Sequence, residues 1–359
     1  HGIRDPLWSR GLGDVYKRQI LIAIIIVVGV IASSGQKQKK VGKGGSIRVT
    51  RLNDHINDLR EALRLSILDK DDLKALQKEE KKTSKAELKE QKESVKKAKD
   101  ADENTPKKKR YFVLNFTGNI AADAVASLRE EITAIVSMAT PADEVVLRLE
   151  SPGGMVHAYG LASSQLLRIK NEKIPLTICV DKVAASGGYM MACLADKLIA
   201  APFAIIGSIG VLVQLPNFHR VLKKYEVDYE IISAGEYKRT LTNFGEITPK
   251  AREKVKDDVE NIHDIFKTWV KEYRPSIEID KIATGETWVG SQAKERYMVD
   301  ELKTSDEYIV EACKDSEVFE IEYEFKKTIQ EKFSSVLEES AAKLLSRWVN
   351  RPNNDIYQK

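Results

Sequence analysis

The chain has 359 residues, of which 42% are hydrophobic and 31% are charged, with a formal net charge of +4. This hydrophobic content can form a substantial core, which excludes a wholly disordered protein. Three cysteines without C-x-x-C spacing exclude a disulfide framework and a zinc ribbon. The net charge averages unlike parts: residues 36–110 carry 23 Lys and Arg against 14 Asp and Glu, whereas residues 111–359 carry 31 against 38. A basic arm therefore precedes an acidic globular body.

The first 35 residues contain one apolar run, which is unbroken over Ile20–Ala32. With its small neighbours it covers residues 20–35, fewer than the roughly 20 residues that span a bilayer. Lysines follow the run and an Ala-x-Ala cleavage site does not, so a membrane helix is favoured over a signal peptide. Residues 14–19 resemble a translated sequencing adapter. We therefore predict that residues 1–19 are not native and that residues 20–35 form one transmembrane helix, truncated at its start.

Residues 36–110 are expected to form a basic helical or disordered arm beside the membrane. Apolar residues recur at helical spacing from Asn53 to Leu76, which predicts an amphipathic helix. Lys78–Lys99 consists mostly of Lys, Glu, Ala and Gln, which predicts a solvated helix or a disordered spacer. The arm lacks aromatic residues for base stacking, so membrane lipid is favoured over nucleic acid as its partner. The lysines after the span favour a cytoplasmic body, but the other flank lies in residues 1–19, so the membrane side stays open.

Strand and helix patterns alternate from Tyr111 onward. Repeated βα units predict a parallel sheet with helices outside it, and ligands bind such sheets at the carboxyl ends of the strands. The apolar stretch Leu198–Leu215 is interrupted by Gly and Pro, which indicates buried strands and turns and not a second membrane span. The strands are expected at residues 111–116, 144–149, 176–180, 197–200 and 231–233, and the helices at residues 123–139, 156–170 and 186–195.

Two of the predicted strands end in glycine-rich turns, at residues 150–154 and 182–189. In the second turn, paired glycines after Ser186 allow a tight strand-to-helix connection that exposes the serine hydroxyl, as in a nucleophile elbow. In the first turn, Gly153 and Gly154 can direct backbone N–H groups toward an oxyanion. The spacing fits either a catalytic serine or two turns that serve only packing.

A nucleophilic serine needs an activating base. His157 follows the first glycine turn, and either it or His219 would complete a Ser-His-Asp triad, although neither has a distinctive setting. Lys238 is another candidate, because it follows the predicted strand at 231–233 and so lies at a strand end. His263 lies within a helix among charged residues and is expected to be solvated. The residues alone do not decide whether a histidine or Lys238 is the base.

Four ordered motifs together resemble peptidase family S49, the signal peptide peptidase A family of membrane serine proteases. The resemblance covers most of residues 20–350, and it is strongest to a branch with an N-terminal span, a Lys-rich arm and a single protease domain. It implies a ClpP/crotonase-like α/β fold, preceded by one transmembrane helix and a basic helical arm, in a cell inner membrane protein. The motifs are Glu-Ser-Pro-Gly-Gly at 150–154, Asp-Lys-Val-Ala-Ala-Ser-Gly-Gly-Tyr at 181–189, Gly-Ser-Ile-Gly at 207–210 and Gly-Glu-Tyr-Lys-Arg-Thr at 235–240.

The resemblance also implies a Ser-Lys dyad. Ser186 matches the family's nucleophile and Lys238 its general base, while Gly153 matches the oxyanion-hole glycine, with the N–H of Gly187 as its partner. The rings that the family forms imply a homo-oligomer with active sites at subunit interfaces, so that Lys238 serves the Ser186 of a neighbouring subunit. The expected substrates are hydrophobic or signal-peptide-like peptides, without cofactor, metal or nucleic acid. The alternatives are a ClpP-like Ser-His-Asp peptidase, a crotonase-type acyl-CoA enzyme and a catalytically silent membrane scaffold.

The protease domain is predicted to span residues 111–315, followed by a helical tail over residues 316–359. The C-terminal signature of the family departs from its usual pattern at one position. Where a glycine commonly ends a helix, this chain has Tyr297. A left-handed helix cap is costly for tyrosine, so we expect the helix to end differently there.

Overall fold

The computed structural model describes residues 44–69, 71–72 and 108–326. The chain divides into two units, and the one that comprises Ile47–Glu324 carries the sheets and the candidate site. The other unit, His1–Ser46 with Phe325–Lys359, is described only at residues 44–46, 325 and 326. The predicted segments 1–19 and 20–35 lie outside the described residues. Within the described ranges, no helix is both long and apolar enough to cross a membrane.

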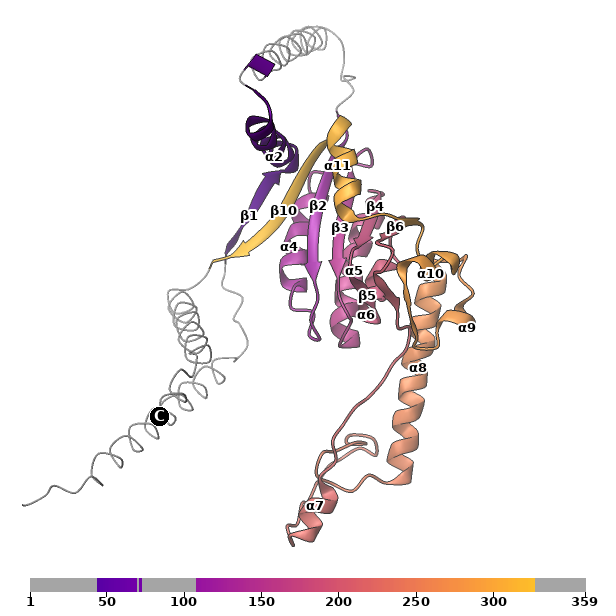
Figure 1. Ribbon diagram of the computed structural model, residues 1–359. Helices are drawn as coiled ribbons and strands as arrows, with labels where there is room; N and C mark the ends of the chain where they lie inside the picture. Colours follow the sequence, from indigo (N-terminus) through magenta and orange to yellow (C-terminus); the bar gives the residue numbers. More distant parts are fainter. Residues whose placement is uncertain (1–43, 70, 73–107, 327–359) are drawn as a thin grey trace, which may run out of the picture. The chain divides into compact units, whose positions relative to one another are not determined.

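A seven-stranded sheet forms the centre of the larger unit (Figure 1). The pairs that join β10 to β2 and then run through β3, β4 and β6 to β9 are all parallel. The strands predicted at 111–116, 144–149, 176–180 and 197–200 are confirmed, and this mixed α/β arrangement fits the predicted ClpP-like fold class. In sheet order the strands are β1 (Gly45–Arg51), β10 (Glu317–Phe325), β2 (Arg110–Thr117), β3 (Glu144–Glu150), β4 (Leu176–Val180), β6 (Lys197–Ala200) and β9 (Glu301–Leu302).

Helices cover both faces of this sheet. Alternate residues of each strand point to opposite faces, so one strand contributes side chains to two separate cores. Leu147 of β3 belongs to the larger core with α4 (Val125–Val136), α5 (Val156–Asn171) and α6 (Gly187–Ala192). Its neighbour Val146 belongs to a smaller core with Leu52 of α2 (Leu52–Ile67) and Ile309 of α11 (Ser305–Asp315). Figure 1 shows α11 over the face of the sheet opposite α4 and α5.

A second sheet of three short strands lies against the carboxyl ends of the main strands. It has the order β5 (Val183–Ala185), β7 (Ile205–Gly207) and β8 (Thr287–Val289). Ser151, the first residue after β3, forms an isolated parallel bridge with Ala184 of β5. The apolar stretch that begins at residue 198 contains β6, a turn and β7, as predicted, but its end is not buried, since Leu212 and Val213 are 72% and 56% exposed.

The remaining helices follow the second sheet. The longest is α8 (Pro249–Tyr273), and Thr248 caps its start by accepting a hydrogen bond from the N–H of Ala251 at 3.2 Å. The shorter ones are α7 (His219–Lys224), α9 (Ile279–Ile282) and α10 (Gly290–Glu295).

Three predicted segments differ from the structure. Residues 231–233 are not a strand, because this β-branched run has no neighbouring strand to pair with among the described residues. Its Ile232 is 91% exposed. The predicted basic arm contains a strand, β1, and the helix α2, which starts close to the predicted amphipathic helix, ends at Ile67. The helical tail predicted from residue 316 begins instead with β10, whose alternation of Glu with apolar residues has a period of two. Residues 327–359 of that tail lie outside the described residues.

Candidate active site

Ser186 lies between β5 and α6, at the strand-to-helix turn that the sequence predicts. Its backbone has φ 51° and ψ −121°, a combination that costs a non-glycine residue about 1–3 kcal/mol. The N–H of Ser186 donates to the carbonyl oxygen of Gly207 on β7 at 2.8 Å, which fixes the turn to the second sheet. A half-buried serine in a strained turn at a strand end is typical of a nucleophile elbow.

Gly153 packs directly against this turn. It is buried and has φ +90°. A Cβ atom at residue 153 would come within 2.7 Å of the oxygen of Ala185, the nitrogen of Gly187 and the Cβ of Ser186. Only glycine fits such an approach, because any side chain would displace the backbone of the neighbouring turn. The structure thus brings Gly153, Ser186 and Gly187 together.

Two buried hydroxyls beneath these turns were not singled out by the sequence. The N–H of Gly153 donates to Ser151 Oγ at 3.1 Å, and Ser151 Oγ lies 2.5 Å from the hydroxyl of Tyr159 on α5. Ser151 belongs to the first glycine-rich motif, so its position offered a signal. Tyr159 offered none, because within α5 it falls among the apolar residues of the core.

Lys238 is not beside Ser186 in the single subunit. It lies exposed in a turn, where its N–H donates to the oxygen of Gly235 at 3.1 Å. Among the described residues, no hydrogen bond joins Lys238 to Ser186. The hydrogen bonds of residues 212–248 that the described structure contains run within this segment or to α8, as in the ion pair of Glu236 with Lys250.

The histidines do not contact Ser186 either, in the part of the chain that the structure describes. His157 is exposed near the start of α5, and His219 is the first residue of α7. The prediction that His263 is solvated is wrong. His263 is half-buried on α8, and its Nε2 lies 3.2 Å from the oxygen of Ile209, because α8 packs against the turn that follows β7.

The segment 212–248, which we call the extension, exposes an unusual amount of apolar surface. Leu212, Tyr225 and Ile232 are 72%, 71% and 91% exposed. Phe244 makes ring contacts with both Phe218 and Tyr229, with centroid distances of 6.0 and 5.6 Å, so part of the extension has its own small cluster. So many exposed apolar side chains within one segment are typical of an interface.

The two buried cysteines are poor rivals to Ser186 as nucleophiles. Cys179 lies on β4, and Cys193 follows α6. Burial raises the pKa of each thiol to about 12. Both thiols therefore stay protonated near neutral pH, and a protonated thiol is a weak nucleophile.

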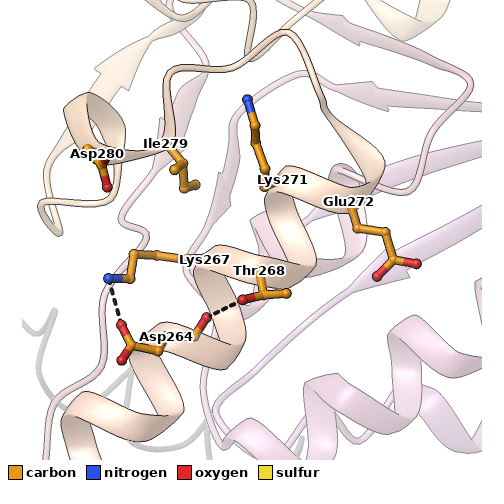
Figure 2. Close-up of a pocket in the computed structure, with 7 residues that line it drawn as sticks. All are labelled: Asp264, Lys267, Thr268, Lys271, Glu272, Ile279 and Asp280. Atoms are coloured by element: carbon orange, nitrogen blue, oxygen red, sulfur yellow. Dashed lines mark hydrogen bonds and ion pairs between the residues drawn. The ribbon is translucent and has the colours of Figure 1, made fainter.

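An open pocket of about 600 Å³ lies between α8 and α9, away from these turns (Figure 2). Both of its lysines already have partners: Lys267 pairs with Asp264 at 2.6 Å, and Lys271 donates to the oxygens of Pro275 and Ile277. No serine, cysteine or histidine lines it. This pocket is therefore a surface feature of the helices and not the candidate active site.

The strained serine, the adjacent glycine amides and the parallel sheet are features expected of an enzyme that carries out acyl transfer through a serine nucleophile. Comparison with known proteins agrees with this class. Family models of peptidase family S49 and of its N-terminal region match residues 168–319 and 16–166, respectively. The chain belongs to peptidase family S49 and is a peptidase.

Individual relatives span the chain to different extents. The "Probable protease SohB" of Haemophilus influenzae is 47% identical over 353 residues, which cover 98% of this chain and 99% of the relative. The protein of the same name from Buchnera aphidicola subsp. Acyrthosiphon pisum is 50% identical over 228 residues, or 64% of this chain and 68% of the relative. "Protease 4" of Haemophilus influenzae is 30% identical over 170 residues and is covered over only 28% of its length.

Proposed function

We propose that this protein is a ClpP/crotonase-like serine endopeptidase with a Ser-Lys dyad, in which Ser186 is the nucleophile and Lys238 the general base. The observation that carries the proposal is the direct packing of Gly153 against Ser186 and Gly187. It sets two backbone N–H groups beside a strained serine, which is the arrangement that stabilises an oxyanion during acyl transfer. Membership of a peptidase family makes a peptide the substrate.

Lys238 acts on the Ser186 of a neighbouring subunit in this proposal. Two observations support a base supplied by another copy of the chain: Lys238 is exposed and unconnected to Ser186 in one subunit, and it lies in the apolar extension. A lysine can accept a proton only in its neutral form. Burial between subunits disfavours the charged form and so prepares the amine to act as a base.

The reaction then follows in two steps. Neutral Lys238 takes the proton of Ser186, Oγ forms a bond to the peptide carbonyl carbon, and the N–H groups of Gly153 and Gly187 hold the resulting oxyanion. The C–N bond breaks as protonated Lys238 gives its proton to the leaving amine. Lys238 next activates a water molecule, which cleaves the acyl-enzyme and regenerates Ser186. Hydrophobic or signal-peptide-like segments are the proposed substrate class.

The variants Ser186→Ala and Lys238→Ala test the dyad. Each is expected to lower kcat for cleavage of an unfolded protein by roughly 10⁴-fold or more, because the members of a catalytic unit fail together. His157→Ala and His219→Ala are the matched controls and are expected to keep activity. Full activity of a purified, folded Lys238→Ala enzyme would refute the dyad. Loss of activity in a folded histidine variant would favour the Ser-His-Asp alternative.

A further inference from the structure

A chain of buried hydroxyls ends at the N–H of Gly153. Ser151 and Tyr159 both have 0% exposure. The N–H of Gly153 is 3.1 Å from Ser151 Oγ, which is 2.5 Å from the hydroxyl oxygen of Tyr159. That oxygen is in turn 2.8 Å from the carbonyl oxygen of Asn119, in the turn after β2. The chain therefore links the turns that follow β2 and β3.

The number of protons fixes the direction of this chain. A carbonyl oxygen can only accept, so Tyr159 donates its single hydroxyl proton to Asn119. Ser151 therefore donates its proton to Tyr159, and a lone pair of Ser151 Oγ accepts the N–H of Gly153. Burial raises the pKa of the Tyr159 hydroxyl, which keeps this proton in place near neutral pH. Each bond in such a chain polarises the next, so the groups act together.

The backbone packs closely around this chain. A Cβ atom on Gly118 would come within 2.5 Å of both Ser151 Oγ and the Tyr159 hydroxyl. A Cβ atom on Gly187 would come within 2.4 Å of the Tyr159 ring. Tyr159 thus touches one proposed oxyanion donor through its ring and reaches the other, Gly153, through Ser151. The backbone oxygen of Ser151 also accepts the N–H of Ala185 at 3.0 Å, next to the nucleophile.

We propose that Ser151 and Tyr159 are positioning residues of the oxyanion hole, which hold the amide of Gly153 in one orientation beside Gly187 until the oxyanion forms. The inference rests on the proposed function. Ser151 Oγ is neutral, whereas the oxyanion is charged and is the stronger acceptor. The N–H of Gly153 can therefore bond to the oxyanion from the orientation that Ser151 Oγ already holds, so the amide does not have to reorient when the oxyanion forms. This gain occurs only in the transition state, so it contributes to kcat and not to KM.

The test uses Tyr159→Phe and Ser151→Ala in the full-length chain. Each is expected to lower kcat by roughly 10-fold, less than the loss of a whole oxyanion donor, with KM changed by less than about 2-fold. Tyr308→Phe is the matched control. Its hydroxyl donates to Glu144 at 2.6 Å in the smaller core, on the opposite face of the sheet, and kcat should stay unchanged. Should Tyr159→Phe fail to fold, Ser151→Ala, which only removes an atom, carries the test.

A peptide aldehyde and the matching peptide alcohol provide a second measurement. The carbonyl carbon of the aldehyde forms a bond to Ser186 Oγ while Lys238 takes the serine proton, and the electrons of the C=O π bond move to the oxygen, which becomes the oxyanion. The alcohol forms no such bond. Both variants should weaken aldehyde binding by roughly 10-fold and leave alcohol binding unchanged, a difference that a merely structural role would not produce. The double variant should lose no more aldehyde affinity than the single variant with the larger loss, because both residues act through one chain.

Three results would overturn the inference while peptide cleavage by the wild-type enzyme stands. They are an unchanged or higher kcat in Ser151→Ala, an equal loss of aldehyde and alcohol binding, and fully additive losses in the double variant. A wild-type enzyme that neither cleaves peptides nor reacts with a fluorophosphonate at Ser186 would instead overturn the proposed function, and this inference with it.

Discussion

Tyr297 carries backbone strain at the end of α10. It has φ 59°, its N–H donates to the oxygen of Lys294 at 3.0 Å, and the N–H of Met298 donates to the oxygen of Ala293 at 2.9 Å. These are the two hydrogen bonds of a Schellman motif, which normally has glycine in the left-handed position. The expectation that the helix ends differently is therefore wrong. The buried Met298 holds the turn, and the tyrosine adopts the strained conformation.

Tyr297→Gly is expected to stabilise the protein. The left-handed conformation costs tyrosine about 1–2 kcal/mol, and the greater freedom of glycine in the unfolded chain offsets about half of the gain. The free energy of unfolding should therefore rise by about 0.5–1 kcal/mol, measured by chemical denaturation. Tyr225→Gly is the matched control: Tyr225 is similarly exposed but has φ −100°, so this change should bring no gain. Equal effects of the two substitutions would show that Tyr297 is not strained.

For individual residues, the sequence predicted which residues lie in the turns at the strand ends better than it predicted which side chains contact those turns. Ser186 and Gly153 could be found because glycine next to a serine at a strand end leaves a visible pattern. Tyr159 could not be found, because its hydroxyl acts through the tertiary contact of α5 with the turn of Ser151. Lys238 was predicted both from its place after an expected strand and from the resemblance, and because that strand is absent only the resemblance still supports it.

Glu131 on α4 is an unusual acidic residue because it lies in the core. It is 5% exposed, and its Oε1 accepts the backbone N–H of Tyr323 on β10 at 2.8 Å. Burial, together with the nearby charge of Glu322, raises the pKa of Glu131 to about 7. The carboxyl group thus links α4 to β10 and titrates near neutral pH.

This link predicts a pH dependence of stability. The folded state binds the proton of Glu131 more tightly than the unfolded state, whose glutamate has a pKa of about 4.3. Stability from this group is therefore fully present below that value and is lost as the pH rises through about 7. The loss between pH 5 and pH 8 is on the order of 2 kcal/mol. Glu131→Gln should remove this component from denaturation curves.

The control for this measurement is Glu130→Gln, because Glu130 is the exposed neighbour on the same helix. It should leave the pH dependence of the free energy of unfolding unchanged. If the Glu131→Gln protein showed the same change between pH 5 and pH 8 as the wild type, Glu131 would not be the titrating group.

The predicted elements were most accurate where the main sheet is buried on both faces. The strands at 144–149 and 176–180 are mostly apolar and are bounded by turns, and β3 and β4 match them closely. Residues 231–233 have a similar composition but are solvent-exposed. Their local β-propensity does not produce a strand, because no partner strand pairs with them among the described residues. For β10, the sequence pattern was present, but its partner β2 lies about 200 residues earlier, a distance that local patterns do not reveal.

For the whole molecule, the main consequence is that a single subunit does not complete the proposed site. Ser186 and both glycines lie in the sheet region, whereas Lys238 lies in the exposed apolar extension. A head-to-tail arrangement of subunits, closed into a ring, would cover the extension and give each Ser186 a lysine.

The membrane span at residues 20–35 stays a prediction, and protease protection in inverted and right-side-out vesicles tests both the span and the side of the body.

Complementation between two inactive variants tests the central claim most directly. Full-length Ser186→Ala and Lys238→Ala chains with different tags are mixed under conditions that exchange subunits, and mixed assemblies are isolated through both tags. The Lys238→Ala subunits keep Ser186, and the Ser186→Ala subunits supply the lysine. Peptide cleavage should therefore return, at about one quarter of the sites in an equal mixture, with fluorophosphonate labelling only on Lys238→Ala subunits. Mixed assemblies that form but stay inactive would contradict an active site shared between subunits.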